Sequence, residues 1–358
     1  MPSLKEIKGR INSISSTLAI TSAMKMVASA KLQKAQMAIQ NMLPYERRLY
    51  SMLVDLMGAM NISAAASEDG SVRGSGSAER GFDQSGDRLS LSNRHDLAGM
   101  DGAYSLMAQR EVRKVAIVAF ASNSSLCGAF NSNVIREATA VINEYRASGL
   151  GDADITVYSV GRKMAEAMKK LGFPSPADFT KMSDSPSYDA ASALAQELFD
   201  GFVSGRFDKV ELVYNHYKST SSQPTTRQTY LPLSLADATA DLQAGKIADS
   251  ASESDTNRGA EPVGAPVVRQ GSPTTEDLIV EPSKEALIAT LLPKVVRLRI
   301  FTTLLDSAAA EHAARTVAMQ LATDNGNDLL QELTLEYNKG RQQKITSEIL
   351  DLVGGSLQ

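Results

Sequence analysis

The sequence predicts an α/β fold, in which the two ends of the chain form a long antiparallel coiled coil and the middle forms a small βαβ domain. Strand signals alternate with helices only in the middle of the chain, whereas both ends are helical. Aromatic residues make up 5% of the chain and tryptophan is absent, which suits extended helix better than a large globular core. We expect five segments: an N-terminal helix (1–60), a flexible insertion (61–110), an α/β domain (111–235), a second flexible insertion (236–277) and a C-terminal helix (278–358).

The C-terminal segment is the longest predicted element. Strong helix formers dominate it, and from about residue 294 to 353 they predict one helix of about 60 residues, which is roughly 90 Å long. A helix of this length must lie along another long helix or project into a partner. Pro293 is expected to break it, so that residues 283–292 form a separate short helix.

The N-terminal segment supplies the second long helix. Ser3 and Glu6 read as a capping box at its start. Apolar residues then recur three and four apart, as in a coiled-coil seam, at Leu4, Ile7, Ile11, Ile14, Leu18, Ala28, Leu32, Ala35, Ile39 and Met42. Pro44 marks a possible kink, with the helix continuing to about Met60. The alternative, two ordinary helices of a bundle, lacks the other long helices that a bundle needs.

The middle of the chain alternates strands with helices. Strands are predicted at 115–120, 155–160 and 209–214, helices at 132–148, 162–171 and 189–204, and an extended segment at 223–233 that can pair with the last strand. The continuous apolar run of the first strand is typical of a buried parallel sheet. We therefore predict a small, incomplete Rossmann-like domain.

Composition excludes several classes of protein. The net charge of −4 gives no reason to expect nucleic-acid binding, and the single cysteine, Cys127, excludes an intramolecular disulfide. No apolar run approaches the 18 residues of a membrane span, and the polar N-terminus enters a helix at once, so we expect no signal peptide. Any membrane association is expected to come through partners.

No catalytic, cofactor or metal site is predicted. Residues 126–130 lie where a strand meets a helix, but Gly128 stands alone, without the glycine pattern of a phosphate loop. Cys127 is therefore expected to be a buried packing residue. His95, His216 and His312 are far apart, and His312 is expected to be a polar position on a helix surface.

The two terminal helices also carry motifs that resemble the gamma subunit of F-type ATP synthases. Residues 20–32 resemble that family's N-terminal helix signature, and residues 311–325, 337–349 and 353–355 resemble its C-terminal helix. Residues 126–128 with Asn131 are similar to its internal motif, although residues 123–125 depart from the usual charged pair. With only Cys127, the thiol switch of chloroplast members cannot operate, and the start of the chain favours a bacterial form.

The resemblance implies a central rotor shaft without a catalytic site of its own. It implies three alpha and three beta subunits, an epsilon subunit and a membrane c ring as partners, at the cytoplasmic face of a bacterial plasma membrane. Residue by residue, it implies contacts with a beta subunit at Met24, Lys25, Arg341, Gln342, Thr346 and Glu348. Without the resemblance, the residues leave open a coiled-coil adaptor with a βαβ head, or a nucleotide-binding enzyme that lacks the usual phosphate loop.

Overall fold

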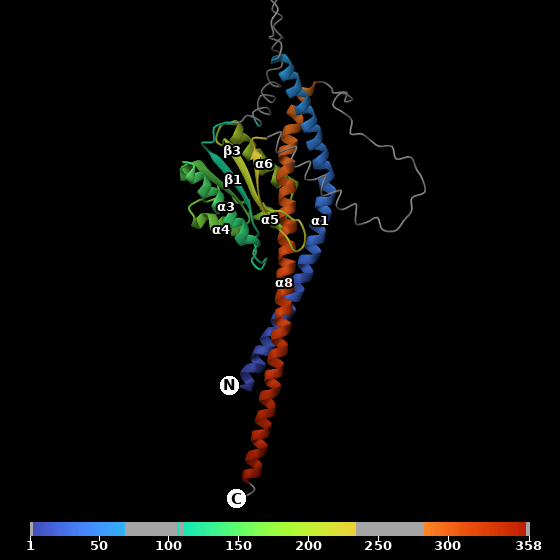
Figure 1. The fold of residues 1–358 in the computed structure, drawn as a ribbon, viewed down its shortest axis with the longest axis vertical. Coiled ribbons are helices and arrows are strands. Elements are labelled where there is room, and N and C mark those ends of the chain that lie inside the picture. Colours follow the sequence, from blue (N-terminus) through green and yellow to red (C-terminus); the bar gives the residue numbers. More distant parts are fainter. Residues whose placement is uncertain (1–2, 69–105, 107–109, 234–282, 356–358) are drawn as a thin grey trace, which may run out of the picture.

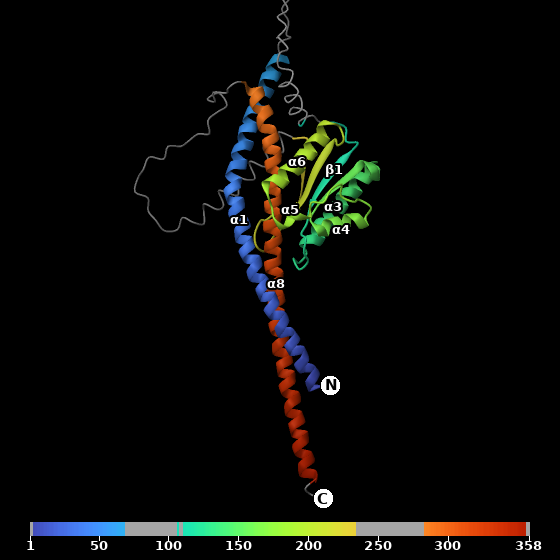
Figure 2. The same cartoon turned by 180° about the vertical axis from the view of Figure 1, so that it is seen from behind.

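Two very long helices organise the computed structural model, which describes residues 3–68, 106, 110–233 and 283–355 (Figure 1). Helix α1 spans Leu4–Glu68 and helix α8 spans Lys284–Gly355, and they run antiparallel, side by side in both views (Figures 1 and 2). The predicted coiled coil is therefore confirmed. Helix α1 ends at Glu68 instead of near residue 60. Apart from residues 106 and 110, the rest of the first predicted insertion and all of the second lie outside the described residues. None of the described helices is long and apolar enough to cross a membrane.

The seam between the two helices follows the predicted apolar positions. Ile7, Ala28 and Leu32 are buried along α1, and Leu32 packs against Ala309 and Ala313 of α8. Small residues on α8 allow the close approach. A Cβ added at Gly326 would lie 2.6 Å from Leu18 Cδ2, so a side chain there would displace the leucine. Alanine and glycine on α8 thus set the short distance between the helices.

Neither proline ends a helix, which corrects the predicted break at Pro293, whereas the kink at Pro44 stays a prediction. Helix α1 is continuous through Pro44 and α8 is continuous through Pro293, so residues 284–292 belong to the long helix. A proline inside a helix costs about 3 kcal/mol. Large apolar side chains near each proline are buried, and each contributes about 1.5–3 kcal/mol; they are Leu49 and Leu53 after Pro44, and Ile288, Leu292, Val295 and Val296 on the two sides of Pro293. Packing therefore outweighs the local penalty.

A four-stranded sheet forms the head of the molecule. Its strands are β1 (Val115–Phe120), β2 (Ile155–Val160), β3 (Lys209–Asn215) and β4 (Thr225–Leu231), in the order β2-β1-β3-β4. The first three pair in parallel and β4 pairs antiparallel to β3, which confirms the predicted hairpin. The connecting helices are α3 (Phe130–Ala147), α4 (Arg162–Lys170), α5 (Thr180–Asp184) and α6 (Tyr188–Val203), and only the five-residue α5 was not predicted.

The two faces of the sheet are covered differently. Val115, Ile117 and Ala119 of β1 pack against α3 and α4. The alternate residues Ala116, Val118 and Phe120 share a core with α6, α8 and the last part of α1. One face of the head is thus covered by the coiled coil itself, and the Tyr230 hydroxyl donates a hydrogen bond of 2.8 Å to the Val296 carbonyl of α8. Head and coiled coil are one packed unit because they share this core.

Candidate partner-binding surface

Helix α8 projects beyond the coiled coil. Leu4, the first residue of α1, lies beside Gly340, where an added Cβ would be 3.1 Å from Leu4 Cδ2. Residues 341–355 therefore extend past the start of α1 by roughly 22 Å. Each of residues 341–350 is exposed. We call residues 341–355 the tip.

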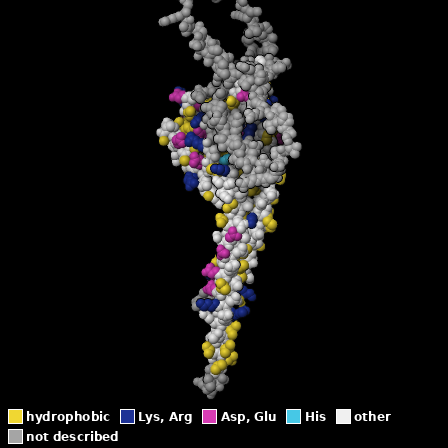
Figure 3. Space-filling view, turned by 45° about the vertical axis from the view of Figure 1, so that its right-hand side comes forward, with side chains coloured by type: hydrophobic (Ala, Val, Ile, Leu, Met, Phe, Trp, Pro, Cys, Tyr) yellow, Lys and Arg dark blue, Asp and Glu magenta, His cyan; other side chains and the backbone are white. Residues whose placement is uncertain are grey.

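The tip carries an apolar stripe. Ile345, Ile349, Leu352 and Val353 follow one another at spacings that place them on one face of the helix. Their exposed fractions run from 47% at Ile345 to 74% at Leu352, and Figure 3 shows apolar side chains gathered at this end of the molecule. Contiguous exposed apolar surface of this kind marks interaction sites. The stripe was not predicted from the sequence, although the spacing of these apolar residues by three and four positions indicates it.

The four sequence-predicted contact residues of α8 all lie on the tip. Arg341, Gln342, Thr346 and Glu348 are exposed. The Thr346 hydroxyl donates to the Gln342 carbonyl at 2.9 Å, and Glu348 forms an ion pair with Lys344 at 3.6 Å. These interactions stay within the helix, and the Arg341 and Gln342 side chains are exposed to solvent. Their contact with a beta subunit stays a prediction.

Met24 and Lys25 form a second patch, separate from the tip. Thr21, one turn earlier on α1, lies against Thr323, with 3.1 Å between the hydroxyl oxygens. Lys25 is therefore about 30 Å from the level of Arg341 along the coiled coil. Met24 and Lys25 are half-buried, but Ile20, Met26 and Val27 beside them are exposed by 60%, 67% and 57%. These apolar side chains lie off the coiled-coil seam. Apolar residues outside the seam are the feature of the sequence that predicts a partner-binding surface here.

A buried ion pair within α8 lies where this helix contacts the head. Arg315 pairs with Glu311 at 2.8 Å, and its Nη2 donates to the Ser124 hydroxyl of the head at 2.7 Å. Burial raises the pKa of the Glu311 carboxyl, although Arg315 opposes the shift. Burial, Arg315 and Lys31 lower the pKa of His312 to about 4. His312 is thus a neutral, half-buried side chain beside Arg315 of α8 and Lys31 of α1.

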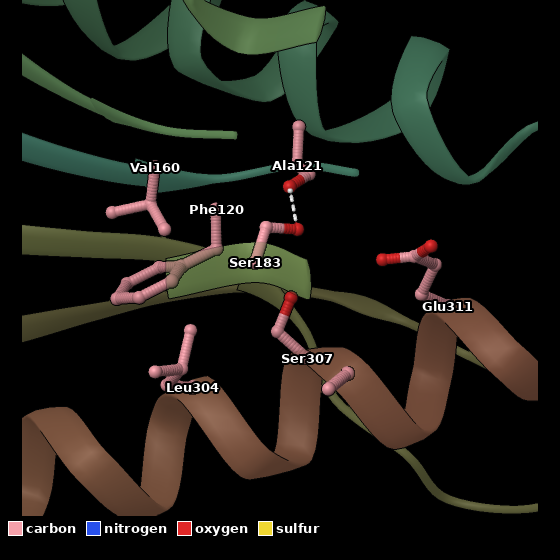
Figure 4. Close-up of a pocket in the computed structure, with 8 residues that line it drawn as sticks. Phe120, Ala121, Val160, Ser183, Leu304, Ser307 and Glu311 are labelled. Atoms are coloured by element: carbon pink, nitrogen blue, oxygen red, sulfur yellow. Dashed lines mark hydrogen bonds between the residues drawn. The ribbon is translucent and has the colours of Figure 1, made fainter. Parts of the chain in front are cut away.

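A small cavity lies at the same junction (Figure 4). It is lined by Phe120, Ala121, Val160, Ser183, Leu304, Ser307, Ala308 and Glu311. The Ser183 hydroxyl donates to the Ala121 carbonyl at 3.0 Å, and the Glu311 carboxylate lies at the edge of the space. The cavity holds about one water molecule, far less than the several hundred Å³ typical of a small-molecule pocket. The residues at this junction therefore serve to pack the head against α8.

The loop between β1 and α3 also packs against α8. Cys127 is buried, as predicted, and its Sγ accepts a hydrogen bond of 3.1 Å from the Asn131 side chain. Cys127 and Phe130 pack against Ala310 of α8, and a Cβ added at Gly128 would lie 3.8 Å from Ala318. Helix α8 thus packs against the loop that holds the phosphate in a phosphate-binding fold.

Replacing Arg315 by methionine is expected to lower the free energy of unfolding by about 3 kcal/mol at neutral pH, because it leaves a buried carboxylate without its counter-charge. A carboxyl whose pKa is raised by folding stabilises the folded state at acid pH and loses that contribution as pH rises through the folded pKa. The loss in Arg315→Met is therefore expected to be larger at pH 8 than at pH 5. Chemical unfolding monitored by circular dichroism measures both values.

Two further variants control this prediction. Arg10→Met breaks an exposed pair with Glu6 and is expected to change stability by less than about 1 kcal/mol. Adding Glu311→Gln to Arg315→Met removes the uncompensated charge and is expected to recover part of the loss. A double variant with no recovery would show that lost packing, and not the buried charge, causes the effect.

Comparisons with known proteins agree with this geometry. A family model described as ATP synthase matches residues 3–357. The ATP synthase gamma chain of Phocaeicola vulgatus is 47% identical over 357 residues, and that of Bacteroides thetaiotaomicron is 45% identical over 358 residues, with 100% of each chain covered in both alignments. The rotor of the Euglena gracilis mitochondrial ATP synthase shares the fold, with a TM-score of 0.51 at 18% identity, over 96% of this chain and 98% of that chain.

A coiled coil with a head fused to one side and a bare, partner-facing tip at the end defines a shaft-type subunit of a larger assembly. Sequence identity of 45–47% over the full length of two curated relatives then identifies the family within this class. The chain belongs to the gamma chain family of the ATP synthase.

Proposed function

We propose that this chain is the central rotor shaft of an ATP synthase and couples ion flow through a membrane c ring to ATP synthesis or hydrolysis at beta subunits. The observation that carries the proposal is the tip, where α8 runs on beyond Gly340 as a single exposed helix with an apolar stripe. A helix end of this kind suits a sleeve of surrounding subunits that encloses it. Full-length similarity to gamma chains supports the same role.

The mechanism follows from stiffness and asymmetry. Helices α1 and α8 support one another along the seam, so a turn applied at the head is transmitted along the coiled coil. A coiled coil of two unlike helices has no threefold symmetry, so each of three surrounding beta subunits meets a different surface. Such differential contacts shift each catalytic site between open and closed states. In synthesis, rotation of the shaft would release ATP from one site at each step.

The chain itself is proposed to be non-catalytic. Among residues 3–68, 106, 110–233 and 283–355, no group of three metal-ligating side chains occurs. The junction cavity holds about one water molecule. The partners we propose are three alpha and three beta subunits around the coiled coil, and an epsilon subunit and the c ring at the head. The chain would thus be held peripherally, at the cytoplasmic face of the membrane, through its partners.

Reconstitution tests this role. The purified chain is mixed with alpha and beta subunits from the same organism, and the mass of the complex and its ATPase activity are measured. We expect one copy of the chain per three alpha and three beta subunits, with activity that depends on the chain. Failure to assemble with competent subunits, or self-association of the chain alone, would favour an adaptor with no rotary role.

A further inference from the structure

The loop that follows β3 reaches across both long helices. The His216 Nδ1 lies 2.6 Å from Asp306 Oδ2 of α8, and the Tyr217 backbone N–H donates to Asp306 Oδ1 at 2.9 Å. The Gln36 side-chain amide of α1 donates to the Tyr217 hydroxyl at 2.6 Å. We call these four residues the clip. It links the carboxyl end of β3, at Asn215, to both helices of the coiled coil.

Packing holds Tyr217 at this crossing. Its ring contacts a cluster formed by Leu32 of α1 with Ala309 and Ala313 of α8. It also contacts the cluster that includes Cys127 and Phe130 of the head. Tyr217 thus lies where the head, α1 and α8 meet, and the clip is a direct polar connection between them.

One member of the clip, His216, is a histidine whose pKa is raised by its partner. The His216 side chain is half-exposed, whereas only 17% of the Asp306 side chain is exposed. The hydrogen bond to Asp306 raises the pKa of His216, the Asp306 charge adds to the shift, and burial and Lys218 oppose it. Asp306 from α8 and Lys218 from the same loop are the charged groups acting on the ring, whereas Gln36 of α1 is neutral and bonds to the Tyr217 hydroxyl.

We propose that the clip is a proton-operated latch between head and shaft, which tightens when His216 is protonated and loosens when it is neutral. A histidine whose pKa is raised by folding contributes its full stabilisation below the unfolded value of about 6.5 and loses it as pH rises through the folded value. The latch is therefore firm at mildly acid pH and weak at alkaline pH. This regulation goes beyond the proposed rotary role and rests on contacts within this chain alone.

Hydrogen exchange of the Tyr217 amide tests the latch, because that N–H donates directly to Asp306. Exchange is measured by NMR in the full-length chain between pH 5.5 and 8.5, and is corrected for the intrinsic pH dependence of exchange. We expect protection of this amide to be several-fold higher at the acid end in the wild-type chain. In His216→Gln, which can still donate a hydrogen bond but does not titrate, the corrected protection is expected to be independent of pH.

Two controls separate the latch from general stability. His312→Gln changes a histidine that is already neutral, so it is expected to keep the wild-type pH dependence. Gln36→Leu removes the bond to α1 and is expected to lower protection equally at both ends of the pH range. Equal pH dependence in the wild-type chain and His216→Gln would overturn the proposal. If His216→Gln does not fold, direct NMR titration of His216 in the wild-type chain decides, and an unraised pKa overturns it.

Discussion

Replacing Arg341 and Gln342 together by alanine is expected to lower the ATPase activity of the complex with alpha and beta subunits at least about tenfold. Both side chains are exposed on the tip, and neither is needed to hold the tip helical. A loss of about 1.4 kcal/mol in the contacts that drive the catalytic sites corresponds to a factor of ten, and arginine is among the residues that most often dominate interfaces. Steady-state ATP hydrolysis by the reconstituted complex measures the effect.

A matched double variant on the head provides the control. Lys163 and Glu166 of α4 form an ion pair of 3.4 Å, far from the tip along the chain. Replacing both by alanine removes a comparable amount of polar surface and is expected to leave ATPase activity within about twofold of wild type. Full activity of the Arg341→Ala, Gln342→Ala complex would remove these residues from the partner-binding surface and leave the apolar stripe as its main element.

Replacing Gly161 by alanine is expected to cost about 4 kcal/mol or more of folding free energy, the largest effect on stability predicted for this chain. Gly161 has φ 96° and ψ 144°, a conformation that is open mainly to glycine. Its added Cβ would lie 2.1 Å from the carbonyl oxygen of Ala121, which is a backbone atom at the end of β1. The turn from β2 into α4 would have to move away from the sheet. Chemical unfolding of the purified chain measures the loss.

Gly172→Ala separates strain from collision. Gly172 also has a positive φ, of 91°, but no atom lies within 4 Å of its added Cβ. Its loss is therefore expected to be about 1–2 kcal/mol, from backbone strain alone. If Gly161→Ala were no worse than Gly172→Ala, the close approach of the β2–α4 turn to β1 would not be a determinant of stability.

Regular patterns made most of the fold predictable. The coiled-coil seam from Leu4 to Met42 could be predicted from the sequence because a coiled coil repeats its buried positions at a fixed spacing. Strand β1 of the head could be predicted from the sequence because all six of its residues are apolar, as a buried strand requires. The positions of Arg341, Gln342, Thr346 and Glu348 came from resemblance to a family, since periodicity alone does not tell a partner-facing polar residue from a solvated one.

The sequence by itself determined the two long helices, their antiparallel pairing and the βαβ head, because each depends on local spacing and composition. Only the tertiary structure decided that α8 continues through Pro293, since burial of neighbouring apolar residues outweighs the local cost of proline. It also decided that α8 covers one face of the sheet, and that half-buried His312 is neutral beside Arg315 and Lys31. These features depend on residues far apart in the chain, and spacing within one segment carries no information about them.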